Sequence, residues 1–264
     1  TSPALIDLQA DCSSLNISNV DECLSAATAF DATTLETSVA ALYSDNCGGM
    51  VTATLTNTVP GGGNTNCSWS FTYTYTISDG CPANNITCTV TRSGGDQTSP
   101  ALIDLQADCS SLNISNVDEC LSAATAFDAT TLETSVAALY SDNCGGMVTA
   151  TLTNTVPGGG NTNCSWSFTY TFTISDGCPA NNVTCTVTRS GGDKTAPIGA
   201  APTGMTNINA CYVDATTPPT GAPAFDALAA AVDYSDNCGG MVTAMLTNTS
   251  VTGDNTGWTL TYTF

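Results

Sequence analysis

The sequence predicts an all-β fold made of antiparallel β-sandwich domains in tandem. Three observations lead to this prediction. Residues 68–78 alternate between apolar and Ser/Thr side chains, Gly-rich turns separate the alternating segments, and the whole pattern returns along the chain. Alternation with a period of two is typical of a strand that buries one face. Short strands and frequent turns in units of this length favour a sandwich of immunoglobulin-like type.

The chain contains an internal repeat. Residues 1–97 return almost unchanged as residues 98–194, and a diverged third copy occupies residues 195–264, which stop before the counterpart of residues 76–97. We predict three immunoglobulin-like domains with these bounds, the third incomplete at its C-terminal end, because each full copy is long enough to bury its own core. The full copies differ at three positions: Tyr75/Phe172, Ile86/Val183 and Gln97/Lys194.

The strands of one copy follow from local alternation. Residues 51–56 and 86–91 alternate as residues 68–78 do, and residues 4–8 and 15–17 show a weaker version of the pattern. Residues 59–64 contain Pro and Gly, which predicts a long turn between two strands. On the apolar face of the strongest strand we expect Trp69, Phe71, Tyr73, Tyr75 and Ile77.

Two further segments complete the predicted domain. Residues 34–43 carry apolar side chains at helical spacing, and residues 225–232 of the third copy are rich in Ala and Leu, so we expect one short helix per copy. The join at residues 92–100 combines Gly-Gly with Pro. We expect flexibility at these glycines, a fixed entry into the next strand, and neighbouring domains close enough to touch.

Charge excludes several classes of function. The chain has 23 acidic residues, three basic ones and no His, for a net charge of −20. Such a surface does not favour nucleic acid or anionic lipid, and no stretch is long and apolar enough for a membrane helix. Without His the usual general bases are absent, and adjacent acids such as Asp21 and Glu22 are better explained as solvated turn residues. We therefore predict that the protein is not an enzyme.

The fourteen cysteines predict disulfides. Each full copy has six cysteines and no Cys-x-x-Cys pair, and the chain has no His, so the spacing does not favour zinc. An even number per copy in a Thr/Ser/Asn-rich chain is typical of disulfides in an oxidising, extracellular compartment. The candidates are Cys12, Cys23, Cys47, Cys67, Cys81, Cys88, Cys109, Cys120, Cys144, Cys164, Cys178, Cys185, Cys211 and Cys238.

The third copy narrows the pairing. It lacks counterparts of Cys12 and Cys67, with Thr256 at the second position, and the loss of two cysteines together suggests a lost pair. We therefore predict Cys12–Cys67 and Cys109–Cys164, while the other connectivities stay open. For these we prefer Cys23–Cys47, Cys81–Cys88, Cys120–Cys144, Cys178–Cys185 and Cys211–Cys238, all within single copies.

Several motifs resemble those of a known family. Asp45-Asn46-Cys47-Gly48-Gly49 precedes an alternating strand, Asn66-Cys67-Ser68-Trp69 opens another, and Ser78-Asp79-Gly80-Cys81 follows it. Together they are similar to HYR-like repeats, immunoglobulin-like modules found in tandem in very large secreted surface proteins of Bacteroidota, including gliding-motility adhesins. The resemblance covers all three copies and implies an extracellular, cell-attached or filamentous structural role. The third copy departs from it by lacking the cysteine of the second motif.

Calcium is the ligand that the loop residues favour most. Asp7, Asp45, Asp79 and Asp96 lie near predicted loops, and their carboxylates are the hard oxygen ligands that calcium prefers. No dense acidic motif accompanies them, and Asp in turns often binds only its own backbone. We therefore expect no obligatory cofactor and keep calcium as an alternative. The Ser/Thr faces of the strands could likewise contact surface polysaccharide, although Thr suits any solvent-facing strand position.

These observations favour a structural stalk or filament array of an extracellular cell-surface adhesin, which gives reach and mechanical strength. The expected partners are neighbouring repeats of the same or identical chains. A glycan- or calcium-binding repeat module is the alternative, and accessory domains of a secreted enzyme come third. Because residue 264 falls inside a predicted strand, we expect either that the polypeptide continues or that a neighbouring chain donates the missing strand.

Overall fold

The computed structural model describes residues 1–216 and 222–264. Contacts divide the chain into two compact units. Unit 1 comprises residues 1–113, 128–156 and 169–187, and unit 2 comprises residues 114–127, 157–168 and 188–264. The all-β class is confirmed: strands dominate, helices are short, and cysteine pairs staple the domains.

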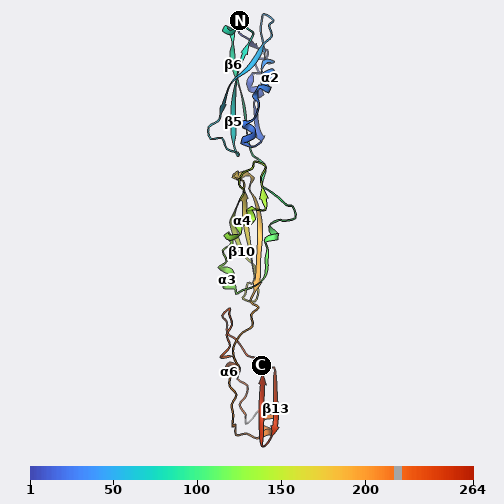
Figure 1. The fold of residues 1–264 in the computed structure, drawn as a ribbon, viewed down its shortest axis with the longest axis vertical. Helices are drawn as coiled ribbons and strands as arrows, with labels where there is room; N and C mark the ends of the chain where they lie inside the picture. Colours follow the sequence, from blue (N-terminus) through green and yellow to red (C-terminus); the bar gives the residue numbers. More distant parts are fainter. Residues whose placement is uncertain (217–221) are drawn as a thin grey trace. The chain divides into compact units, whose positions relative to one another are not determined.

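Repeat 1 lies wholly in unit 1 and is built on a four-stranded sheet (Figure 1). Its strands follow the order β2 (Ile17–Asp21), β6 (Ile86–Gly95), β5 (Trp69–Ser78) and β4 (Thr52–Pro60). Strands β4, β5 and β6 are antiparallel, whereas β2 runs parallel to β6. A two-stranded ribbon pairs β1 (Ala4–Leu5) with β3 (Tyr43–Ser44). The strands predicted at residues 51–56, 68–78 and 86–91 are thus confirmed. The two weaker predictions hold only in part, because residues 6–8 lie outside β1 and only Ile17 of residues 15–17 belongs to a strand.

The core of repeat 1 lies on one face of β5. Along this strand every second residue is buried, from Trp69 to Ile77, as the alternation predicts. Short helices cover the buried face: α1 (Leu24–Thr28), the 3₁₀ helix η2 (Ala32–Leu35) and α2 (Glu36–Ala40). The predicted helix at residues 34–43 is confirmed by η2 and α2, while the sequence did not predict α1. Sheet, ribbon and helices form an arrangement compatible with an immunoglobulin-like sandwich.

Repeat 2 has the same elements, and its four-stranded sheet follows the equivalent order, β10-β11-β12-β8. Its elements are β7 (Ala101–Leu102), β8 (Ile114–Asp118), α3 (Leu121–Thr125), α4 (Glu133–Ala137), β9 (Tyr140–Ser141), β10 (Thr149–Pro157), β11 (Trp166–Ser175) and β12 (Val183–Gly192). Repeat 3 contains α5 (Tyr212–Thr216), α6 (Ala227–Ala231) and the hairpin β13 (Asn248–Asp254) and β14 (Gly257–Thr263). Residues 217–221 of the predicted third domain lie outside the described residues.

One tryptophan contact recurs in all three repeats. The indole nitrogen of Trp69 donates to the carbonyl of Glu22, and Trp166 donates to Glu119, each at 2.8 Å. In repeat 3, Trp258 donates to Ala210 at 2.9 Å. Because each acceptor directly precedes a cysteine, this contact aligns Cys211 with Cys23 and Cys120.

The two glycines of the join do not act as a flexible hinge. Gly94 and Gly95 belong to β6, where a Cβ atom would lie 2.1 Å from the Val20 carbonyl oxygen and 2.2 Å from the Cys67 carbonyl oxygen, respectively. Only glycine allows these close backbone approaches. The expectation of flexibility at Gly-Gly is therefore wrong, and residues 96–100 alone connect β6 to the next repeat.

Candidate functional site: the junction between repeats

The sheet of repeat 1 has two ends with different chemistry. At the first end, called the linker end, β5 begins at Trp69 opposite Gly94, and the chain leaves for repeat 2. At the second, called the loop end, β4 begins and β5 finishes, and loops 45–49 and 79–81 approach each other: a Cβ at Gly49 would lie 3.7 Å from the Asp79 carbonyl oxygen. The ten residues of β5 run between these ends, a distance of about 30 Å.

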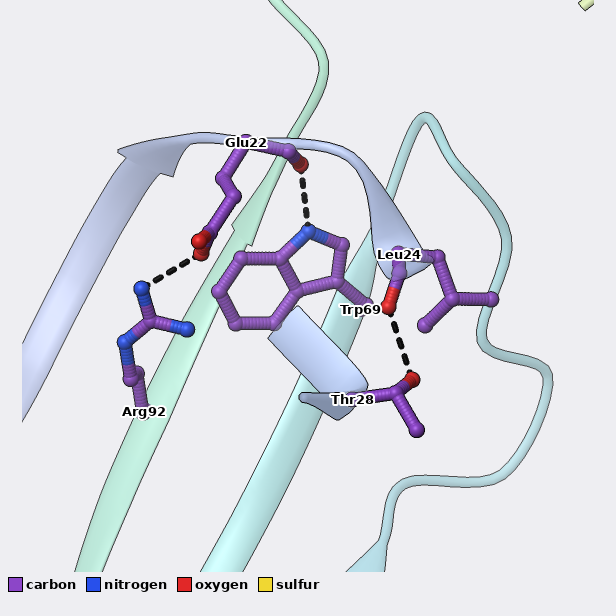
Figure 2. Close-up of polar contacts among 5 residues, drawn as sticks. All are labelled: Glu22, Leu24, Thr28, Trp69 and Arg92. Atoms are coloured by element: carbon purple, nitrogen blue, oxygen red, sulfur yellow. Dashed lines mark hydrogen bonds and ion pairs between the residues drawn. The ribbon is translucent and has the colours of Figure 1, made fainter. Parts of the chain in front are cut away.

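An ion pair between a buried arginine and a partly exposed glutamate fixes the linker end (Figure 2). Arg92 is buried, pairs with the Glu22 carboxylate, and lies over the Phe30 ring at 4.4 Å and the Trp69 ring at 5.0 Å. Trp69 binds the Glu22 carbonyl, and the Leu24 amide at the start of the next helix donates to the Asn66 side-chain oxygen at 3.2 Å. These contacts hold Cys23, between Glu22 and Leu24, at the linker end.

The structure contains five disulfides, of which two lie within repeats. Cys12 pairs with Cys88, and the equivalent Cys109 pairs with Cys185. Both bonds join the turn before the sheet's parallel edge strand to the strand beside it, β6 or β12, and Cys12 and Cys109 are buried. These bonds therefore staple individual domains.

Three disulfides join different repeats. Cys23 and Cys67, at the linker end of repeat 1, pair with Cys144 and Cys178, at the loop end of repeat 2. All four of these cysteines lie in unit 1. In unit 2, Cys120 of repeat 2 pairs with Cys238 of repeat 3. This bond is the equivalent of Cys23–Cys144.

The predicted pairing is therefore wrong, although the prediction of disulfides is confirmed. Cys67 lies beside Gly95, which is seven residues along β6 from Cys88, the partner of Cys12. Cys67 is therefore about 23 Å from Cys88. Cys23 and Cys47 lie at opposite ends of the sheet. A disulfide spans only about 5.5–6 Å between Cα atoms. The other predicted bonds are wrong as well, namely Cys109–Cys164, Cys81–Cys88, Cys120–Cys144, Cys178–Cys185 and Cys211–Cys238. Cys81, Cys164 and Cys211 are free, and the remaining cysteines of these pairs take the partners given above.

Four cysteines are free and exposed: Cys47, Cys81, Cys164 and Cys211. Each has a bonded equivalent in another repeat. Cys47 and Cys81 correspond to Cys144 and Cys178, which bind the repeat before them, whereas Cys164 and Cys211 correspond to Cys67 and Cys120, which bind the repeat after them. The free cysteines are thus of the type that bonds between repeats.

Aspartates from both repeats meet beside the inter-repeat disulfides. An oxygen of Asp96, from the linker of repeat 1, lies within 4.8 Å of an oxygen of Asp142, and likewise of Asp176, both from the loop end of repeat 2. Asp142 and Asp176 are the copies of Asp45 and Asp79. Three of the four calcium candidates are therefore represented here, but across a junction rather than within one repeat. The fourth, Asp7, instead accepts a bond from the Gln9 amide at 2.9 Å.

The cluster is poor in compensating contacts. Asp96 is 5% exposed, and this burial raises the pKa of its carboxyl. The hydrogen bond from the Thr98 amide lowers the pKa by less, and repulsion from Asp142 and Asp176 raises it further. The three basic side chains of the protein are engaged elsewhere: Arg92 with Glu22, Arg189 with Glu119, and Lys194 with Asn116. The sequence missed this grouping because its members are remote in the chain. The 97-residue period was the signal that could have revealed it.

The aromatic residues of β5 and β11 do not form a binding surface. Trp69 and Trp166 are each 2% exposed, and the other aromatics of β5 and β11 are buried with them. They pack the core, as the alternation predicted. Among residues 1–216 and 222–264, no helix has both the length and the apolar character needed to cross a membrane.

A scan against protein-family models finds no match to this chain, and a search of curated proteins finds none either.

Proposed function

We propose that this protein is a load-bearing segment of an extracellular stalk or filament, as in a cell-surface adhesin. The observation that carries the proposal is the pair of disulfides, Cys23–Cys144 and Cys67–Cys178, between consecutive repeats. Disulfides of this number are typical of an oxidising, extracellular compartment. These bonds join one repeat to the next rather than stabilise a single domain. They therefore favour a role in which consecutive repeats must stay attached to each other.

The two bonds triple the covalent connections at the junction. Residues 96–100 supply one backbone connection, and each disulfide adds another. The linker is further fastened to repeat 1, because the Asp21 carboxylate accepts from the Gln97 amide at 2.8 Å and from the Thr98 hydroxyl at 3.2 Å. A stretched or cut linker would therefore leave the repeats joined, which is useful in a stalk under tension.

The free cysteines extend the same scheme to neighbouring repeats. Cys47 and Cys81 can accept the linker end of a preceding repeat, and Cys164 and Cys211 can reach a following one, in this chain or an identical one. The proposed partners are therefore further copies of the same domain. The net charge of −20 opposes unspecific side-by-side association and leaves head-to-tail bonding as the favoured contact.

Cutting the linker tests the proposal. A protease recognition sequence inserted after Gln97, at an exposed position, allows the backbone to be cut in the oxidised chain. We expect the cut chain to run at its full 26.8 kDa on a non-reducing denaturing gel and to separate into two fragments after reduction. As a control, the double variant Cys144→Ala/Cys178→Ala should separate without reductant. Separation of the unsubstituted chain without reductant would contradict the proposal.

A further inference from the structure

We propose that the junction between repeats 1 and 2 binds one calcium ion through the carboxylates of Asp96, Asp142 and Asp176. This inference goes beyond the stalk function, since disulfides can join repeats without a metal. The three residues all belong to unit 1 and come from the linker of one repeat and two loops of the next.

The distances suit a shared ion. Calcium binds oxygen ligands at about 2.3–2.6 Å, so two oxygens on one ion lie at most about 5 Å apart. Oxygens of Asp96 and Asp142, and of Asp96 and Asp176, lie within 4.8 Å of each other. Each of the two loop carboxylates is therefore close enough to Asp96 to share an ion with it.

Buried oxygens without partners point to a missing ligand. Asp142 Oδ1 and Asp176 Oδ2 are buried and have no hydrogen bond. The second oxygen of each carboxylate accepts from the backbone two residues ahead, from Cys144 at 2.8 Å and Cys178 at 2.6 Å. Asp96 is only 5% exposed. One of its carboxylate oxygens accepts from the Thr98 amide, and no described residue donates a hydrogen bond to the other oxygen. Burying carboxylate oxygens unpaired is costly, and a cation removes that cost.

The two nearly identical repeats show what the junction changes. In repeat 1, the Asn84 amide donates to Asp79 Oδ2 at 3.4 Å. In repeat 2, the equivalent Asn181 is buried and donates instead to the carbonyl of Asp96 at 2.8 Å, which leaves Asp176 Oδ2 unpaired. Asp45 also keeps an unpaired oxygen, as Asp142 does. The third carboxylate, from Asp96, is what distinguishes the loop end of repeat 2.

The ligand chemistry favours calcium over other divalent metals. The chain has no His, and Cys144 and Cys178 beside the cluster are disulfide-bonded, so neither soft nor imidazole ligands are offered to zinc or copper. Carboxylates from loops suit the irregular coordination of calcium better than the strict octahedron of magnesium. Extracellular calcium modules bind with dissociation constants of about 0.1–1 mM, and we expect that range here.

The second junction offers a weaker version of the site. In unit 2, oxygens of Asp193 and Asp236, the counterparts of Asp96 and Asp142, lie within 4.8 Å of each other. Two carboxylates provide less charge than three, so affinity there should be lower. A calcium titration of the chain should accordingly show one tighter phase.

Calorimetric titration of the oxidised 264-residue chain with calcium chloride tests the inference. We expect Asp142→Asn and Asp176→Asn each to weaken the tighter phase about tenfold or more, because each removes one charged ligand. The matched controls Asp45→Asn and Asp79→Asn alter the same loops of repeat 1 and should leave the affinity within about twofold. The variant Asp96→Asn leaves both loops of repeat 2 unchanged. It should weaken calcium binding as strongly as Asp142→Asn and Asp176→Asn do.

Two results would overturn the inference. The first is the absence of any saturable calcium binding by the unsubstituted chain up to about 10 mM, well above the expected range. The second is an equal loss in the control variants, which would indicate diffuse binding to surface acids. Peptide mapping of each variant without reduction checks that Cys23–Cys144 and Cys67–Cys178 remain, so that lost binding is not lost folding.

Discussion

The inter-repeat disulfides should carry force when the linker backbone cannot. The perturbation is the protease site inserted after Gln97, cut in a chain held by its two ends in an optical trap. Once the linker is cut, the shortest covalent route runs from residue 1 to Cys23, across to Cys144, back to Cys120, across to Cys238 and on to residue 264. The tether should therefore survive the cut.

The route also fixes how far the cut chain can extend. It uses residues 1–23, 120–144 and 238–264, about 72 residue steps, which at about 3.4 Å each reach roughly 250 Å. The full unfolded backbone of 264 residues would reach roughly 900 Å. We expect the cut, oxidised tether to stop extending near 250 Å, to which the inserted residues add nothing because the route does not pass through them.

Cysteine variants give this experiment its control. With Cys144→Ala alone, load still passes through Cys67–Cys178 and the tether should survive. With Cys144→Ala and Cys178→Ala together it should break as soon as the linker is cut. Breakage of the unsubstituted, oxidised tether on cutting would refute the reasoning, as would extension of the cut tether well beyond 250 Å without reductant.

Three other predictions concern stability. Tyr75 is fully buried and donates to the Ala32 carbonyl at 2.7 Å, and repeat 2 has Phe172 at this position, so Tyr75→Phe should lower the local stability of β5 by about 1 kcal/mol and Phe172→Tyr should raise that of β11 similarly. Amide hydrogen exchange measures both, and unchanged exchange in the two variants would count against this role of the hydroxyl. Reductant should lower the melting temperature more than a calcium chelator does, because each disulfide contributes about 2–4 kcal/mol; a larger chelator effect in separate melts would make calcium the main staple. Hydrogen bonds from the Thr33 side chain and then its backbone lower the pKa of Asp31, so the stabilisation from this charged cap is present above the ordinary pKa and lost as pH falls through the lowered one. Asp31→Ala should therefore reduce the melting temperature at pH 6, with the difference from the unsubstituted chain closing near pH 2, and a gap that stays constant with pH would contradict a charge-dependent cap.

The sequence predicted what depends on local pattern. The alternation at residues 68–78 identified β5 and its buried face. The short helix α1 was missed because Leu24–Thr28 spans little more than one turn, too short for a periodic signal. The sequence did not show that Gly94 and Gly95 are needed for close packing. Val20 and Cys67 approach these glycines only in the folded domain, and both are remote from them in the sequence.

The disulfides show where sequence reasoning failed. The third copy lacks counterparts of Cys12 and Cys67, which suggested one lost bond, but the two cysteines belong to different bonds. Every preferred pairing assumed partners within one copy. For Cys23 and Cys47 this assumption fails because the two residues lie at opposite ends of the sheet. The spacing of the cysteines in the sequence does not give the length of sheet that separates them. The same assumption kept Asp96 apart from Asp142 and Asp176.

Peptide mapping of the oxidised chain without reduction tests the central claim most directly. Trypsin can cut this chain only after Arg92, Arg189 and Lys194, so the cysteines of the three copies fall in three different tryptic fragments. We predict cross-linked fragments that contain Cys23 with Cys144 and Cys67 with Cys178, beside the internal bond Cys12–Cys88. Recovery of Cys23 joined to Cys47, or of Cys67 joined to Cys12, would contradict the account.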